Sequence, residues 1–298
     1  MQTIITRHGE GKLATKVFVS SEDSFNVTSV IVMGKKECVL IDCQWTRANA
    51  HRVIAEIIET GLELKAIFAT HAHPDHYWGM GEIAEAFPNA KCYAPEPVCT
   101  LYSHQYQPKL DEWTDIIGEQ NLCRKQCDRL EPLTETFIEL EGEKLEIIRC
   151  MGDLMWNTIV WIPSIKTVCG SDVIFNDAHP FTCEVDAEQR KLWMKDIDGI
   201  AALGAETIIP GHMREGTLLD GSSLDFMRRY LIETENAIAT TNSAGEFYYY
   251  MAKKFPTASL NILSNEMNSE VFKGGREWAW NEDPDPAWLK FRTAWLDD

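Results

Sequence analysis

The chain has 298 residues, 45% of them hydrophobic, and its 46 acidic side chains outnumber the 28 basic ones to give a formal net charge of −18. That apolar share is typical of a globular protein with a full core, whereas so strong a negative charge repels nucleic-acid phosphates and anionic membrane surfaces. We therefore expect a small-molecule substrate, with neither a nucleic acid nor a membrane as a partner.

Periodic apolar patterns in the first half of the chain predict strands that alternate with helices. Strands are expected at residues 27–32, 38–41, 66–69 and 91–94, and helices at 48–59 and 79–87. The first two strands form a hairpin around Gly34, and the first helix ends at Gly61. This alternation is typical of a layered α/β domain.

The second half is predicted to begin with a mostly helical insertion around residues 97–131, which could wall a pocket. Strands are then expected at 137–150, 158–162, 167–173 and 207–209, and helices at 186–204, 222–242 and 245–254. We expect a single domain over residues 1–298 with a helical C-terminal extension at 222–298. The extension is predicted to pack on the domain, either over the site or against a second subunit. The second arrangement would form a homodimer.

The cysteines and the N-terminus indicate a cytoplasmic protein. Nine cysteines are an odd number, and several of them, such as Cys38 and Cys169, lie in apolar runs where a free thiol behaves as a small hydrophobic group. Residues 1–8 have neither the sustained apolar core nor the cleavage site of a signal peptide. No stretch approaches the roughly 18 apolar residues that span a membrane.

Four metal-competent side chains lie within six positions, directly after the strand predicted at residues 66–69. They are His71, His73, Asp75 and His76. The carboxyl ends of strands in an α/β sheet open onto the ligand crevice, so these side chains are expected to face solvent and substrate. Histidine and aspartate are common metal ligands, and the density of the motif predicts a metal site.

The order of motifs resembles that of the metallo-β-lactamase superfamily of metal-dependent hydrolases, over roughly residues 15 to 215. The matching segments are His71-x-His73-x-Asp75-His76, Gly152-Asp153, Gly170-Ser171-Asp172 and Gly211-His212. The resemblance implies an α/β fold that forms a four-layer αββα sandwich around a dinuclear metal centre. It further implies that one ion binds His71, His73 and Asp153, that a second binds Asp75, His76 and His212, and that Asp172 bridges both.

Asp153 stands where the family has a third histidine in its first metal site. A site of two histidines and a carboxylate suits zinc, and it also suits iron or manganese. We expect two divalent metal ions, with Zn²⁺ as the first choice. The alternative is that Asp153 is a solvated loop residue in a site that has lost one metal.

The resemblance implies a dinuclear hydrolase that uses a metal-bound hydroxide to open an ester, lactone or lactam bond. Asp75 is a candidate for proton transfer, Tyr77 for donation to the oxyanion, and His179 for contact with substrate. A packed aromatic ring and a structural hydrogen bond are the alternatives for Tyr77 and His179. The motif continues as Trp78-Gly79-Met80, without the Gly-Gly of thioester-cleaving glyoxalase-like members.

Aromatic and sulfur-containing side chains near the ligands indicate an apolar or aromatic small substrate. They are Trp45, Trp78, Met80, Met151, Met155, Trp156 and Phe181. Two other readings remain open. The set of His71, His73 and Asp153 also suits a mononuclear non-haem iron oxygenase of the same fold, and loss of the third histidine permits a non-catalytic binding descendant.

Overall fold

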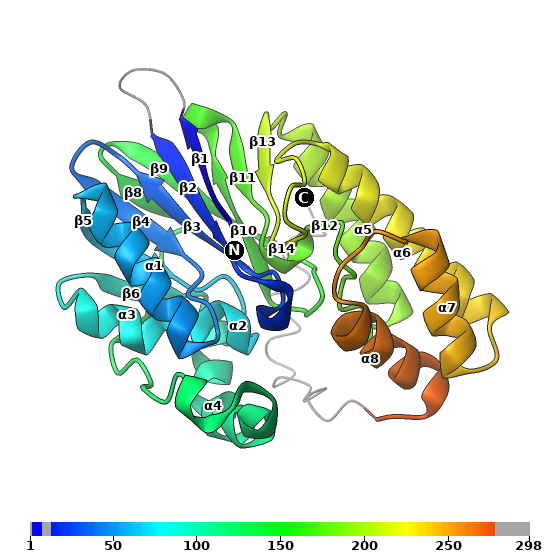
Figure 1. The fold of residues 1–298 in the computed structure, drawn as a ribbon. Coiled ribbons are helices and arrows are strands. Elements are labelled where there is room, and N and C mark those ends of the chain that lie inside the picture. The colour runs from blue at the N-terminus through cyan, green and yellow to red at the C-terminus, as the bar shows by residue number, and fades with distance from the viewer. Residues whose placement is uncertain (1, 8–12, 278–298) are drawn as a thin grey trace.

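Two β-sheets packed face to face form the centre of the protein (Figure 1), whose computed structural model describes residues 2–7 and 13–277. In spatial order, the first sheet contains β1 (Gln2–Arg7), β2 (Ala14–Val19), β3 (Thr28–Met33), β4 (Glu37–Ile41), β5 (Glu63–Phe68), β6 (Lys91–Ala94) and β7 (Leu130–Pro132). The second sheet contains β13 (Thr207–Ile209), β11 (Thr167–Cys169), β10 (Asn157–Ile162), β9 (Glu143–Cys150) and β8 (Phe137–Leu140). A short parallel pair joins β12 (Phe175–Asn176) to β14 (His212–Met213).

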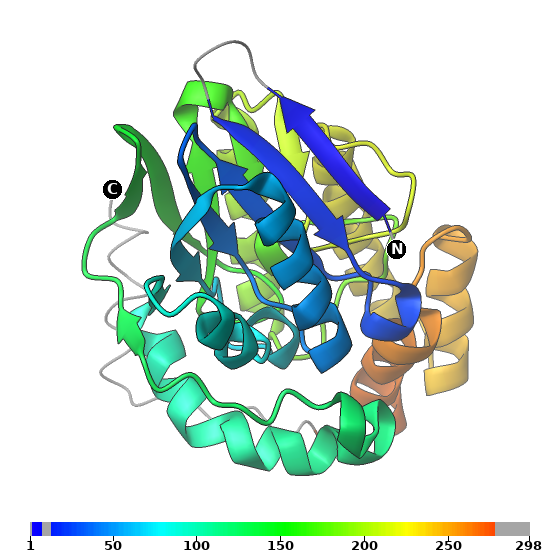
Figure 2. The same ribbon diagram turned by 60° about the vertical axis from the view of Figure 1, so that its left-hand side comes forward.

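Helices cover the outer face of each sheet (Figures 1 and 2). On the first sheet they are α1 (Arg47–Thr60), α2 (Pro74–Tyr77), α3 (Met80–Ala86) and α4 (Glu96–Ile117). On the second sheet they are α5 (Ala187–Ala202) and α6 (Ser222–Thr240), whereas α7 (Ala244–Lys254) packs on α6 and α8 (Glu266–Ser269) packs on α7. In the part of the chain that the structure describes, no helix is both long and apolar enough to cross a membrane.

The alternation of side chains along the strands explains the layers. In β3, Val30 and Val32 belong to the core between the sheets, together with Val160 and Ile162 of β10. Ile31, which lies between the two valines, belongs instead to the core beneath α1 and α3. Successive side chains of a strand point to opposite faces, so each sheet buries both of its faces. The fold is therefore the four-layer αββα sandwich that the resemblance implied.

The predicted strand at 167–173 is wrong in its second half. Strand β11 ends at Cys169, and residues Ser171–Val173 form a 3₁₀ turn. Ser171 has a φ of 45°, in the left-handed region, which an extended strand cannot accommodate. The turn carries Asp172 at the carboxyl end of the strand, so the irregularity brings this carboxylate to the edge of the sheet.

The insertion predicted around 97–131 is helical only in its first part. Helix α4 ends at Ile117, a short 3₁₀ turn follows at Glu119–Asn121, and the chain then reaches strand β7 at Leu130. Strands β1 and β2 were not predicted from the sequence. In the C-terminal extension, α8 is flanked by π-helical turns at Asn261–Asn265 and Glu270–Gly274, and the expected tail lies outside the described residues beyond 277. Helices α4 and α8 lie at the same end of the sandwich as α2 (Figure 1).

Candidate metal centre

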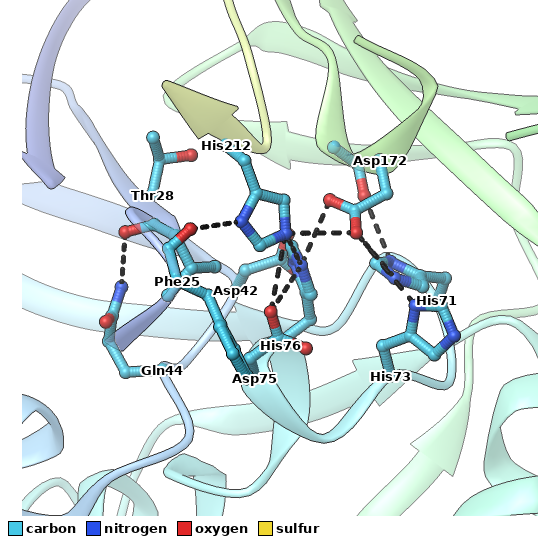
Figure 3. Close-up of polar contacts among 12 residues, drawn as sticks. Phe25, Thr28, Asp42, Gln44, His71, His73, Asp75, His76, Asp172 and His212 are labelled. Carbon is cyan, nitrogen blue, oxygen red and sulfur yellow. Dashed lines mark hydrogen bonds and ion pairs between the residues drawn. The ribbon is translucent and has the colours of Figure 1, made fainter. Parts of the chain in front are cut away.

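Loops at one edge of the sandwich bring together all seven predicted metal ligands, and Figure 3 shows His71, His73, Asp75, His76, Asp172 and His212. His71 and His73 follow β5, while Asp75 and His76 lie in α2. The remaining three come from the other half of the molecule: Asp153 follows β9, Asp172 follows β11, and His212 begins β14. The site therefore requires both sheets.

His71, His73, Asp153 and Asp172 form the first group of donors, with one ligand atom of each lying within 4.8 Å of all the others. Asp153 Oδ2 is 3.0 Å from His73 Nδ1, and Asp172 Oδ2 is 3.5 Å from His71 Nε2. The structure thus places Asp153 in the first group of donors instead of in a solvated loop, and its side chain is buried.

Asp75, His76 and His212 form the second group, again within 4.8 Å of one another. Asp172 faces this group as well, because its Oδ1 lies 3.1 Å from His76 Nε2 and its Oδ2 lies 3.1 Å from His212 Nε2. One carboxylate therefore contacts histidines of both groups, as a bridging ligand must.

The ligand histidines are oriented by hydrogen bonds on their outer nitrogens. His76 Nδ1 lies 2.8 Å from Asp42 Oδ2, and His212 Nδ1 donates to the carbonyl of Phe25 at 2.7 Å. In His73 the two ring nitrogens exchange these roles. Its Nε2 lies 2.9 Å from Glu184 Oε2, and its Nδ1 faces Asp153 in the donor group. Such partners fix the ring orientation of metal-binding histidines.

The electrostatics of this cluster fit divalent cations. Burial opposes ionisation of Asp172, but the rings of His212 and His76 hold the pKa of its carboxyl well below the usual value. Burial also disfavours a charged His73, yet Asp153 and Glu184 raise the pKa of this imidazole well above its ordinary value. The buried carboxylate of Asp172 thus draws positive charge into this space, and a metal ion would supply the same compensation.

Unpaired polar atoms in the cluster support the same fit. Among the described residues, the buried His71 Nε2 has no hydrogen-bond partner, although its Nδ1 lies 3.1 Å from both Thr70 Oγ1 and Ser171 Oγ. Buried polar atoms without partners are rare and call for an explanation. Imidazole nitrogen and carboxylate oxygen are ordinary zinc donors, so both groups fit divalent metal ions.

Three residues of the site were not predicted from the sequence: Asp42, Glu184 and Lys109. Asp42 was available as a candidate, since it directly follows strand β4 as His71 and His73 follow β5. It also accepts hydrogen bonds from the Thr70 amide and hydroxyl. Glu184 and Lys109 carry no such signal, because each lies far in sequence from the ligand loop that it contacts.

A cavity extends from the metal centre and is mainly apolar. Its lining includes Phe25, Trp45, Trp113, Phe175, Phe181, Leu260, Leu263 and Met267. Trp45 stacks on Phe25 with ring centroids 4.2 Å apart and meets Trp113 edge-on at 5.4 Å. Asp75, Asp153 and Asp172 also line the cavity, which makes the donors accessible to a bound molecule.

Tyr77 and His179, both predicted as catalytic residues, do not line this cavity. Tyr77 is fully buried against Tyr102, with ring centroids 5.0 Å apart. It directly follows His76 on α2, but its side chain points into the core beneath the helices. His179 is equally buried, and its Nδ1 lies 2.9 Å from the hydroxyl of Tyr230. The structure therefore favours a packed aromatic ring for Tyr77 and a structural hydrogen bond for His179.

Comparisons with known proteins agree with this geometry. The model of the metallo-beta-lactamase superfamily matches residues 23–144. A hydroxyacylglutathione hydrolase from Aliivibrio salmonicida is 28% identical over 195 residues, covering 64% of this chain and 63% of that protein. Hydroxyacylglutathione hydrolase 2 from Vibrio vulnificus is 30% identical over 132 residues, 43% of each chain. This chain thus spans less than two thirds of the length of these relatives.

Solved structures show the same fold. A metallo-beta-lactamase family protein from Thermus thermophilus superposes with a TM-score of 0.60 at 18% identity, covering 83% of this chain and 87% of that chain. A metallo-beta-lactamase from Pontibacter korlensis gives a TM-score of 0.55 at 18% identity, covering 78% and 99%. Identities this low establish similarity of fold alone.

Proposed function

We propose that this chain, whose residues 23–144 match the model of the metallo-beta-lactamase superfamily, is a hydrolase with a dinuclear metal centre that cleaves a carbonyl-based bond of a small apolar or aromatic substrate. The bond is an ester, thioester, lactone or lactam. The observation that carries the proposal is the position of Asp172, whose carboxylate lies between two groups of donors.

The proposed ion sites use the two groups described above, with Zn²⁺ as the expected metal. Bound divalent cations acidify a water molecule and polarise a carbonyl oxygen, which supplies a nucleophile without a serine or cysteine. Asp75 lines the cavity and its Oδ2 lies 3.4 Å from His212 Nε2. It is the carboxylate we propose to take up or deliver a proton next to the reacting carbonyl.

The cavity supports a small substrate. Its volume is about 120 Å³, in a measure where one water needs about 10–15 Å³, so it accepts a group of roughly ten non-hydrogen atoms. The stacked rings of Phe25 and Trp45 favour an apolar or aromatic group there. Both of the relatives described above are named hydroxyacylglutathione hydrolases, which adds thioesters to the candidate bonds.

The two other readings have weaker support. A mononuclear iron oxygenase would need His71, His73 and Asp153 but not the second group, which the chain retains in full. A non-catalytic descendant would not need the donors to remain oriented, yet Asp42 and Phe25 hold His76 and His212 in place.

Metal analysis and a substrate panel test the proposal. We expect protein purified without chelator to hold about two metal ions per chain and to hydrolyse members of an aryl-ester, thioester, lactone and lactam panel. His71→Ala should lower turnover by several orders of magnitude with native circular dichroism. His51→Ala, which alters an exposed histidine of α1, is the matched control. A single bound iron with oxygen consumption, no bound metal, or near wild-type turnover in His71→Ala would contradict the proposal.

A further inference from the structure

The cavity contains one basic residue whose charge the metal chemistry does not use. Of the described residues that line the cavity, Lys109 is the only lysine or arginine. It comes from the middle of α4, in the insertion, and only 4% of its surface is exposed. A lysine is rarely buried to this extent, because removing an ammonium group from water is costly.

The surroundings of Lys109 explain how its charge is held. Its Nζ donates a hydrogen bond to the carbonyl of Ala72 at 3.2 Å, between the ligands His71 and His73. Burial lowers the pKa of the Lys109 amine, and the carboxylates of Glu184 and Asp75 oppose this effect. An ammonium has three N–H donors and can serve a carbonyl and more than one anion at once.

Bound metal ions would change the net charge of the cavity beside Lys109. Asp75 and Asp153 line the same cavity as Lys109, and both belong to the proposed ion sites. Divalent cations held by these carboxylates would offset their negative charge, so the cavity would no longer repel an anion. The loaded cavity then attracts an anion beside Lys109 more strongly than the metal-free cavity does.

From this arrangement we infer that Lys109 forms an anion subsite, so that the preferred substrates carry a carboxylate close to the scissile carbonyl. The apolar part of such a substrate lies against the wall formed by Phe25, Trp45 and Trp113, while the carboxylate contacts Lys109. Helix α4 thus contributes the selectivity of the cavity and the ligand loops contribute its chemistry. This inference rests on the proposed hydrolase function and adds a substrate class to it.

A pair of esters that differ in one charge tests the inference on wild-type protein. 4-Nitrophenyl hemisuccinate carries a carboxylate on its acyl group, and its methyl ester is nearly the same size and neutral. We expect kcat/KM to favour the anionic ester by about tenfold or more, as for a charge-assisted hydrogen bond. Equal values for the two esters would overturn the inference regardless of how any variant behaves.

Variants of Lys109 separate an anion subsite from a structural role. Lys109→Met should raise KM for the anionic ester about tenfold while both constants for the neutral ester stay within twofold, and Lys109→Arg should restore the preference. Lys125→Met removes an exposed lysine with the same change in net charge and is the control. If Lys109→Met impairs both esters equally, the residue only supports the loop at Ala72 and the inference is wrong.

Calorimetry provides a readout without turnover. Monomethyl succinate should bind metal-loaded wild-type protein at least tenfold more tightly than Lys109→Met with the same metal content. Equal affinities would mean that the carboxylate contacts the ions alone, which would also overturn the inference. If neither ester is hydrolysed while this binding difference persists, the proposed hydrolase function fails and the anion subsite remains.

Discussion

The imidazole of His76 and the carboxylate of Asp42 are 2.8 Å apart, and this contact joins the ligand-bearing helix α2 to the end of strand β4. Both side chains are almost completely buried. Asp42 also accepts hydrogen bonds from the amide and hydroxyl of Thr70, so the same carboxylate holds the start of the ligand loop. One residue outside the ligand set therefore positions two parts of the metal centre.

Asp42→Asn should weaken metal binding about 10–100-fold, because the amide cannot replace the charged partner of His76. The affinity for Zn²⁺ can be measured by competition with a chromogenic chelator. Asp23→Asn changes an exposed carboxylate and should leave the affinity unaltered. An affinity equal to that of wild type would show that Asp42 serves the fold and not the metal site.

Asp153 distinguishes a complete first site from a vestigial one. Asp153→Ala should lose about one ion per chain together with most activity. Asp153→His should keep two ions and shift the acid limb of the pH–rate profile to lower pH, because a neutral ligand leaves the activated water more acidic. Metal counts and pH profiles provide the measurement. Unchanged stoichiometry in Asp153→Ala would place this carboxylate outside the coordination shell.

His179 should lower the stability of the folded protein at acidic pH, and it should not contribute to catalysis. Burial lowers the pKa of His179 from 6.5 to about 4, so below pH 6.5 the unfolded chain takes up a proton that the folded chain does not. The stability that this group provides is present above pH 6.5 and is lost as the pH falls toward 4, by up to about 3 kcal/mol.

His179→Gln should therefore flatten the fall in the free energy of unfolding between pH 6.5 and 4, measured by urea titration. Turnover at pH 7 should stay within a few-fold of wild type, since His179 does not line the cavity. The exposed His51→Gln should keep the pH dependence of wild type. A large loss of turnover in a folded His179→Gln protein would restore the catalytic role first predicted for this residue.

Asn268 of α8 should control the loop that carries Phe181 and Glu184 to the cavity. Its side chain accepts hydrogen bonds from the amides of Thr182 and Cys183, at 2.9 and 3.1 Å, and donates to the carbonyl of Pro180 at 2.8 Å. Asn268→Ala leaves these buried groups unpaired, which costs about 1–3 kcal/mol for each group.

The expected result for Asn268→Ala is a lower urea midpoint together with a higher KM, because the loop no longer holds one wall of the cavity. Asn236→Ala, at an exposed position of α6, is the control and should change neither quantity. A folded Asn268→Ala protein with unchanged KM would show that the loop keeps its position without α8.

The parts of the site that could be predicted from sequence are those encoded locally. His71, His73 and His76 lie within six positions of the chain and follow an apolar run that predicts a strand. Tyr77 is equally close in sequence, yet it points away, since consecutive residues of a helix face directions about 100° apart. Glu184 and Lys109 could not be predicted, because tertiary packing alone brings them to the ligands. The strand predicted at residues 167–173 runs past the end of β11, because the amino-acid sequence does not indicate the left-handed backbone of Ser171.

The assembly of the metal centre from residues 71 to 212 has a consequence for the folding pathway. Neither group of donors is complete until the loops of both sheets have docked, and contacts of such long sequence separation form late and slowly. Metal ions cannot gather the donors in the early, partly collapsed chain, so they should have little influence on the folding rate. Their stabilisation should appear instead as a lower unfolding rate, so the metal-loaded protein should stay folded longer than the metal-free protein.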